Sequence, residues 1–235
     1  MTPDEQTFTH PQTKHYVVEH LDNELEAWSK LEYLTIAREC APSRDTPHSQ
    51  MPHSPSFHLT SLPEELYNKL PKELKWHGNL HATMDEVIQL PGLKSEEVCL
   101  LDPRADKDMA PEDGDVFRWF VFGGILEVKR GQNVGDDPPR DRTAELRKYG
   151  FTGRRLGPVQ MTTDTAVRVT RLVVEQKIPL NEIPFVDFPE LKISKNETTE
   201  MPFRYVKNED GTPVMPEGMV DLIKEDSNKG FTDMM

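Results

Sequence analysis

The stretch RWFVFGG, residues 118–124, is a run of apolar and aromatic side chains that ends in two glycines. A short segment that is apolar at nearly every position is typical of a strand buried on both faces, as strands are in a parallel sheet covered by helices. The segment EEVCLLD, residues 96–102, has the same character and stops at Asp102-Pro103. These two segments predict neighbouring strands in the interior of a mainly parallel sheet.

Strands and helices are expected to alternate on either side of these two segments. Further strands are predicted over 15–20, 57–62 and 153–157, and helices over 23–40, from 63 with a break at Pro71, over 141–149 and from Thr163. In the first helix, Leu25, Trp28, Leu31 and Leu34 recur at helical spacing and predict its buried face. The order β-α-β-α predicts an α/β fold with a mainly parallel sheet and flanking helices.

Changes in composition suggest how the chain is divided. Residues 1–14 are expected to be a disordered N-terminus, and 15–183 to form the α/β domain. Within it, residues 41–55 carry four prolines and read as a mobile insertion. The remaining 184–235 form a C-terminal extension packed on the domain, either along its surface or as an edge strand, with a short helix over 216–227.

Composition limits the possible functions. No run of about 18 apolar residues occurs, which excludes a transmembrane helix, and the N-terminus lacks the pattern of a signal peptide, so a cytoplasmic location is expected. The net charge is −13, which argues against general nucleic-acid binding and favours a basic partner. Residues 127–171 are the exception, with ten Lys and Arg against six Asp and Glu. Cys40 and Cys99 have no ligand-spaced neighbours and are expected to be reduced core residues.

Three predicted strand ends carry unusual loops: LLDPRA (100–105), FGGIL (122–126) and RRLGPVQMTTDTA (154–166). Ligands of open α/β sheets bind at such carboxyl ends. The motifs GxGxxG, GxxxxGK[ST] and GxSxG are absent, and every histidine precedes residue 82. His48, His53 and His58 do not have a common zinc spacing, so no metal is expected. This inventory suits a group transfer in which the cofactor supplies the electrophile. Taken singly, each loop also has a purely structural interpretation, as a turn, a glycine bend or a helix cap at Thr163 or Asp164.

The motifs, taken together, resemble one known family. In chain order they are KHYVVEH (14–20), a helix containing Trp28, Leu31, Glu32 and Tyr33, LLDPRA (100–105), FVFGGIL (120–126), GDDPPRDRT (135–143), RRLG (154–157), QMTTDTA (160–166), NETTEMPFRY (196–205), and MPEGM with DLIK (215–224). This series is similar to the eukaryotic SPOUT-class protein arginine N-methyltransferases that modify protein S three of the small ribosomal subunit. The likeness covers about residues 14 to 230.

The resemblance implies a C-terminal deep trefoil knot that binds S-adenosylmethionine. The cofactor residues it implies are Leu101, Asp102, Phe122, Gly123, Gly124, Leu126, Gly135, Leu156, Gly157, Met161, Thr162 and Thr163. Carboxylates would aim the acceptor guanidinium and take its proton. The catalytic residues it implies are Asp137, Asp141 and Glu200, with Asp164 and Glu197 as further candidates. Arg140 and Arg142 would fix the loop or the cofactor carboxylate.

The resemblance also implies a substrate, namely the basic ribosomal protein S three. RNA is the second possibility, because most SPOUT enzymes act on RNA, and an inactive interaction module is the third. A monomer is expected, with a homodimer through the knot as the alternative. The family pattern runs from GGIL directly into the glycine-acid-proline turn, so EVKRGQNV (127–134) is interpreted as an inserted loop. This loop splits the expected cofactor segment.

Overall fold

A six-stranded parallel sheet forms the centre of the molecule in a computed structural model of the 235-residue chain. The structure describes residues 13–42, 54–75, 79–123, 142–193 and 198–232. The strands are β1 (His15–Glu19), β2 (Ser56–Thr60), β3 (Leu80–Ala82), β4 (Val98–Leu101), β5 (Trp119–Gly123) and β6 (Thr152–Arg154). They lie in the order β3-β2-β1-β5-β4-β6, and the paired strands are parallel. The predicted mainly parallel α/β fold is therefore confirmed.

Side chains of the central strands alternate between two hydrophobic clusters, one on each face of the sheet. On β5, Phe120 and Phe122 join the first cluster, whereas Trp119 and Val121 join the second. This two-residue period is a property of extended backbone. Because both faces are covered, both sets of positions are apolar, and the strand reads as a continuous hydrophobic run. Cys99 on β4 lies in the first cluster as a buried free thiol, as predicted.

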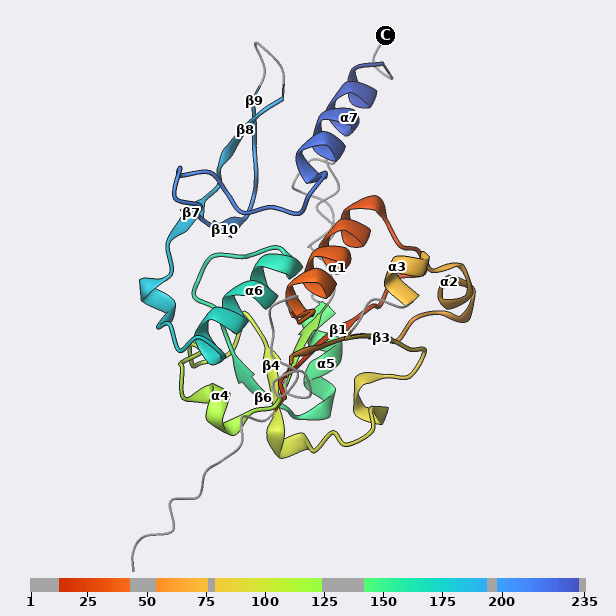
Figure 1. The fold of residues 1–235 in the computed structure, drawn as a ribbon, viewed down its shortest axis with the longest axis vertical. Helices are drawn as coiled ribbons and strands as arrows, with labels where there is room; N and C mark the ends of the chain where they lie inside the picture. Colours follow the sequence, from red (N-terminus) through yellow and green to blue (C-terminus); the bar gives the residue numbers. More distant parts are fainter. Residues whose placement is uncertain (1–12, 43–53, 76–78, 124–141, 194–197, 233–235) are drawn as a thin grey trace, which may run out of the picture.

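Two long helices cover the first face of the sheet. Helices α1 (Ala27–Cys40) and α6 (Thr163–Val174) lie side by side there (Figure 1). Helix α5 (Arg142–Leu146) and the 3-10 turn η4 (Arg147–Tyr149) cover the opposite face, where Leu146 and Tyr149 join the second cluster. The predicted helix over 141–149 is therefore an α-helical turn followed by a 3-10 turn that ends at Gly150, whose φ of 69° is left-handed.

The buried face of α1 differs from the predicted stripe. The buried residues of this helix are Ser29, Glu32, Tyr33, Ile36, Ala37 and Cys40. Leu25 precedes the helix, which begins only at Ala27. Trp28 and Leu31 instead pack, half-buried, against a third hydrophobic cluster formed by the C-terminal part of the chain. Leu34, like Leu25, packs against the first cluster, so the predicted stripe combines residues of two apolar faces of α1.

The remaining helices are short and lie around the sheet. They are α2 (Glu64–Lys69), α3 (Lys72–Lys75), α4 (Asp113–Val116) and the 3-10 turns η2 (Val87–Gln89), η3 (Ser95–Glu97) and η5 (Leu180–Glu182). Pro71 separates α2 from α3, as predicted. No helix in the described ranges is both long enough and apolar enough to cross a membrane.

The C-terminal part forms small sheets of its own. Strands β7 (Phe185–Asp187) and β10 (Arg204–Val206) pair antiparallel, as do β8 (Glu190–Lys192) and β9 (Thr198–Glu200). Helix α7 (Met219–Thr232) follows and contacts α1, and in Figure 1 it extends away from the six-stranded sheet. The edge strand expected after residue 183 therefore pairs within this part and not with the main sheet. Strand β3 was not predicted, because its three residues give too short a pattern.

Several predicted segments lie outside the described residues. These are residues 1–12 of the expected N-terminal tail, most of the 41–55 insertion and the whole of 127–134. The path of the chain over 124–141 is needed to trace a trefoil knot, so the knot stays a prediction.

Candidate functional site

The first and third predicted cofactor loops form one unit at the carboxyl ends of β4 and β6. The Asp102 N–H donates to the Arg154 carbonyl at 2.8 Å, which extends the β4–β6 pairing by one residue. Further along, the Met109 N–H donates to the Arg155 carbonyl at 2.9 Å. Strands β5, β4 and β6 are consecutive in the sheet. The ends of all three predicted loops are therefore neighbours, as a strand-end site requires.

The middle loop begins at Phe122 and Gly123, the last residues of β5. Phe122 is buried in the first hydrophobic cluster and anchors the start of the loop there. Several predicted site residues lie outside the described residues: Gly124, Leu126, Gly135, Asp137 and Asp141, with the further candidates Arg140 and Glu197. Only the start of this loop can therefore be compared with the prediction.

Asp102, at the end of β4, holds the α5–η4 segment in place. Its carboxylate receives two hydrogen bonds of 2.6 Å from the Arg147 guanidinium, and it also accepts from the Arg104 N–H. Burial opposes ionisation of Asp102, but these hydrogen bonds outweigh it and lower the pKa of the carboxyl. Both the side chain and the backbone of Asp102 thus have structural partners, since its N–H donates to Arg154 and its carbonyl accepts from the Ala105 N–H.

The third loop is held by the C-terminal extension. The Arg204 N–H donates to the Gln160 carbonyl at 2.8 Å, and Met161 forms an isolated parallel bridge with Arg204. Gly157 has a φ of 84°, a left-handed conformation that favours glycine. A Cβ at Gly157 would lie 3.7 Å from the Arg204 guanidinium. Strand β10 therefore lies directly against the predicted cofactor segment 156–163.

The start of α6 takes a hydrogen-bond partner from α1. The N-cap is Thr162, not Thr163 or Asp164 as predicted, and its hydroxyl donates to the Thr165 hydroxyl at 2.8 Å. The Thr163 N–H, one of the donors left unpaired at a helix start, donates to Glu32 Oε1 at 3.1 Å. Tertiary contact, not a local cap, therefore fixes the end of the third loop.

Glu32 and Asp164 are buried carboxyl groups that interact with each other. Their residues are 0% and 1% exposed. Burial, followed by the charge of Asp164, raises the pKa of Glu32, and burial raises the pKa of Asp164 against the effect of Arg168. The sequence motif included Glu32 and the acid candidates included Asp164, but neither pattern indicated that the two would meet.

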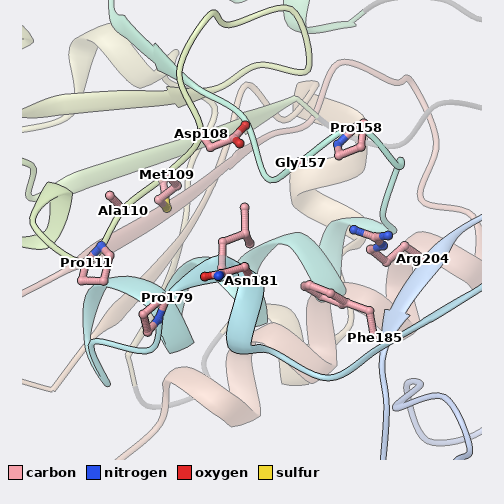
Figure 2. Close-up of a pocket in the computed structure, with 11 residues that line it drawn as sticks. Asp108, Met109, Ala110, Pro111, Gly157, Pro158, Pro179, Asn181, Phe185 and Arg204 are labelled. Carbon is pink, nitrogen blue, oxygen red and sulfur yellow. The ribbon is translucent and has the colours of Figure 1, made fainter.

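A cavity of about 550 Å³ adjoins Gly157 (Figure 2). Its apolar lining includes Met109, Pro111, Pro158, Pro179, Leu180 and Phe185. Asp108, Asn181 and Arg204 are its polar residues. The Arg204 guanidinium lies over the Phe185 ring, 4.7 Å from its centroid, and makes hydrogen bonds of 2.6 and 2.7 Å to Asp187. Among the predicted site residues, Gly157 is the one that lines this cavity.

Glu200 lies on β9, in the C-terminal part. It is exposed and pairs in register with Glu190 of β8. In Figure 1 the β8–β9 pair projects away from the six-stranded sheet. The structure therefore does not bring Glu200 together with the strand-end residues.

A row of histidines crosses the sheet away from this site. His15 Nδ1 and His58 Nε2 are 3.0 Å apart, and the rings of His58 and His81 stack with their centroids 5.0 Å apart. Among the described residues, no group of three or more His, Cys, Asp or Glu is arranged to hold a metal ion.

The chain was compared with known families and curated proteins. Residues 15–230 match the model of the family described as "Protein arginine N-methyltransferase SFM1-like". The chain is 43% identical over 230 residues to protein arginine N-methyltransferase SFM1 of Saccharomyces cerevisiae, and the match spans 94% of this chain and 99% of the yeast protein.

Solved structures of the yeast enzyme share the fold. Its crystal structure complexed with SAM superposes with a TM-score of 0.75 at 43% identity, covering 94% of this chain and 95% of the yeast chain. The yeast structure complexed with SAH superposes with a TM-score of 0.71 and covers 89% of this chain and 94% of the yeast chain. These matches confirm the predicted resemblance, and they extend over both the parallel sheet and the C-terminal part. The chain therefore belongs to the SFM1-like family of protein arginine N-methyltransferases.

Proposed function

We propose that this protein transfers a methyl group from S-adenosylmethionine to an arginine side chain of protein S three of the small ribosomal subunit. The observation that carries the methyl transfer is the 43% identity, over 94% of this chain, to an arginine methyltransferase whose structure was solved with SAM. The identity of the substrate rests on the resemblance of the motifs. It is supported by the net charge of −13, which suits a basic protein.

The residues present fit the proposed cofactor. The loops Leu101–Arg104 and Leu156–Thr163 are joined at the ends of adjacent strands. Gly157, which has a positive φ, lines the wall of the cavity. The cavity of about 550 Å³ is within the range of small-molecule sites. When bound, S-adenosylmethionine supplies an electrophilic methyl group on a sulfonium. The chain itself has to hold the cofactor and position the acceptor.

The acceptor imposes a second requirement. An arginine guanidinium has a pKa above about 12 and arrives protonated, so a carboxylate must orient it and accept its proton as the C–N bond forms. Asp137 and Asp141 are our first candidates because they follow the β5 glycine loop in sequence. Glu200 projects away from the strand ends, so it could contact the substrate but not the reacting guanidinium. We propose that Asp137 or Asp141 acts on the guanidinium.

Radiolabelled cofactor tests the function. The protein is incubated with labelled S-adenosylmethionine and small ribosomal subunits, and the methylated residue is located by mass spectrometry. Label on an arginine of protein S three supports the proposal. Label in ribosomal RNA would instead identify an RNA methyltransferase. Calorimetry that detects no binding of S-adenosylmethionine would identify an interaction module that retains the fold.

The trefoil knot, the monomeric state and the cytoplasmic location belong to the same proposal. Sedimentation equilibrium measures the mass in solution, and a value near twice 27.0 kDa would contradict the monomer. Fractionation of cells followed by immunodetection tests the location.

A further inference from the structure

The carboxyl groups of Glu32 and Asp164 contain two buried oxygens with no hydrogen-bond partner in the described part of the chain. Glu32 Oε1 accepts from the Thr163 N–H at 3.1 Å, and Asp164 Oδ2 accepts from Arg168 at 3.3 Å. The oxygens that remain are Glu32 Oε2 and Asp164 Oδ1. Two buried acceptors without a donor are strongly unfavourable, because each loses its hydration without gaining a hydrogen bond.

One proton satisfies both oxygens. If Glu32 Oε2 carries a hydrogen, it donates to Asp164 Oδ1, and the two side chains are within hydrogen-bonding reach of each other. Two carboxylates this close and this buried do not both ionise. Asp164 is the ionised member, since the Arg168 cation lies beside it. Glu32 is therefore the member that holds the proton, and the pair titrates as a unit.

Groups from every surrounding element face this pair. The Trp28 side chain, from α1, opposes the rise in the pKa of Glu32. The Thr162 hydroxyl and the Thr165 N–H, at the start of α6, oppose the rise in the pKa of Asp164. The Tyr205 hydroxyl, from β10, is buried without a hydrogen-bond partner among the described residues, and burial followed by the charges of Asp164 and Glu32 raises its pKa. Arg168 forms ion pairs with both Asp164 and Glu39. The cluster therefore joins α1, the start of α6 and the C-terminal extension.

We propose that the proton shared by Glu32 and Asp164 holds the segment Met161–Thr163 in its cofactor-binding position, which makes Glu32 a positioning residue. This inference rests on the proposed function. The segment has two tertiary anchors: the Thr163 N–H bonded to Glu32, and Met161 bridged to Arg204. Loss of the proton places two negative charges face to face. Repulsion then separates α1 from the start of α6 and displaces the segment. Cofactor affinity should therefore fall as the pH rises.

Calorimetric titration with S-adenosylmethionine tests this inference between about pH 6 and about pH 9, the range in which buried carboxyl groups are known to titrate. In the wild type we expect Kd to rise about tenfold or more across this range, since one pKa unit corresponds to a factor of ten. In the Glu32→Gln variant, the carboxamide N–H donates to Asp164 and its oxygen accepts from Thr163 at every pH. Its Kd should therefore change much less.

The control variant is Glu217→Gln. Glu217 pairs with Arg38 of the same helix α1 in an exposed ion pair, so this variant should retain the pH dependence of the wild type. Ionisation of the cofactor itself affects all three proteins equally and cancels in the comparison. Asp164→Asn removes the same repulsion from the other side. It replaces Glu32→Gln if circular dichroism shows that the latter does not fold.

Three results would overturn the inference. A Kd of the wild type that does not depend on pH would do so without any variant. Equal pH dependence in the wild type and in a folded Glu32→Gln or Asp164→Asn variant would show that this pair does not control the segment, and would leave the proposed methyl transfer intact. A wild type that does not bind S-adenosylmethionine at any pH would overturn both this inference and the proposed function.

Discussion

Gly157 is the residue at which backbone conformation and predicted cofactor contact coincide. Its φ of 84° is costly for a β-branched residue, by about 1–2 kcal/mol. A new side chain would also meet the Arg204 guanidinium. We expect Gly157→Val to abolish calorimetrically measured binding of S-adenosylmethionine.

A matched variant separates the effect of backbone strain from the effect of a lost cofactor contact. Gly211 has a similar φ of 89°, but nothing lies within 4 Å of the position that a Cβ would take there. Gly211→Val should therefore lose a similar amount of stability in urea unfolding and retain the affinity for the cofactor. Equal affinities of the two variants would place the cofactor away from Gly157.

Asp102 is expected to contribute to stability and not to chemistry. Asp102→Asn removes the charge that binds Arg147, and hydrogen bonds to charged groups contribute about 2 kcal/mol. We expect a loss of that size in urea unfolding at neutral pH. Because the folded-state pKa of Asp102 is lowered, the contribution is present above the unfolded pKa and is lost as the pH falls through the folded pKa. The stability difference between wild type and variant should shrink in acid, and a constant difference would contradict this account.

At the scale of elements, the histidine row makes the sheet sensitive to acid. Burial, followed by nearby positive groups, lowers the pKa of His15 to about 4, and burial followed by His15 lowers that of His58 to about 3. Both groups bind protons more weakly in the folded state, so acid favours the unfolded chain. Stability should decrease as the pH falls below the unfolded value of about 6.5.

Thermal unfolding at about pH 7 and about pH 5 measures this effect, since unfolded histidine titrates between these values. The Tm of the His58→Gln variant should fall less between these two pH values than the Tm of the wild type, because one buried imidazole has been removed. His81→Gln tests the exposed end of the row: it should reduce the loss of Tm less than His58→Gln does, since His81 is exposed on the edge strand β3 and its charge only adds to the effect of burial on His15 and His58. If His58→Gln and the wild type lose Tm equally, the row does not cause the acid sensitivity.

The central strands were predictable because their patterns are local. Strands buried on both faces read as apolar runs, as in 118–124, whatever their neighbours. Helix α1 was predicted at nearly the right place, but the predicted stripe combined two faces: Leu25 and Leu34 pack against the first cluster, and Trp28 and Leu31 against the third. It packs on the sheet through Tyr33 and Ile36 and on the C-terminal cluster through Trp28 and Leu31. Spacing alone cannot separate the two faces, because burial of the outer one depends on segments more than 150 residues further along the chain.

At the scale of the whole molecule, the net charge of −13 predicts how the enzyme finds its substrate. Attraction between an acidic enzyme and a basic protein is screened by salt, with a Debye length of about 10 Å at about 0.1 M. We expect KM for the proposed substrate, protein S three, to rise with ionic strength, whereas Kd for S-adenosylmethionine, measured in the same buffers, should change little. Steady-state assays in graded sodium chloride test this. A KM that is independent of salt would indicate that recognition does not depend on net charge.

Short, contiguous stretches of the chain were enough to predict the parallel α/β fold, the three strand ends and the family, because buried strands and ordered motifs are local patterns. The pairs of groups that meet across the molecule became known only from its three-dimensional packing. Glu32 and Thr163 are separated by 131 positions, and Gln160 and Arg204 belong to different parts of the chain, yet each pair shares a hydrogen bond. Such contacts depend on how α1, α6 and β10 pack together. The residue pattern of one helix or strand does not specify which other element packs against it.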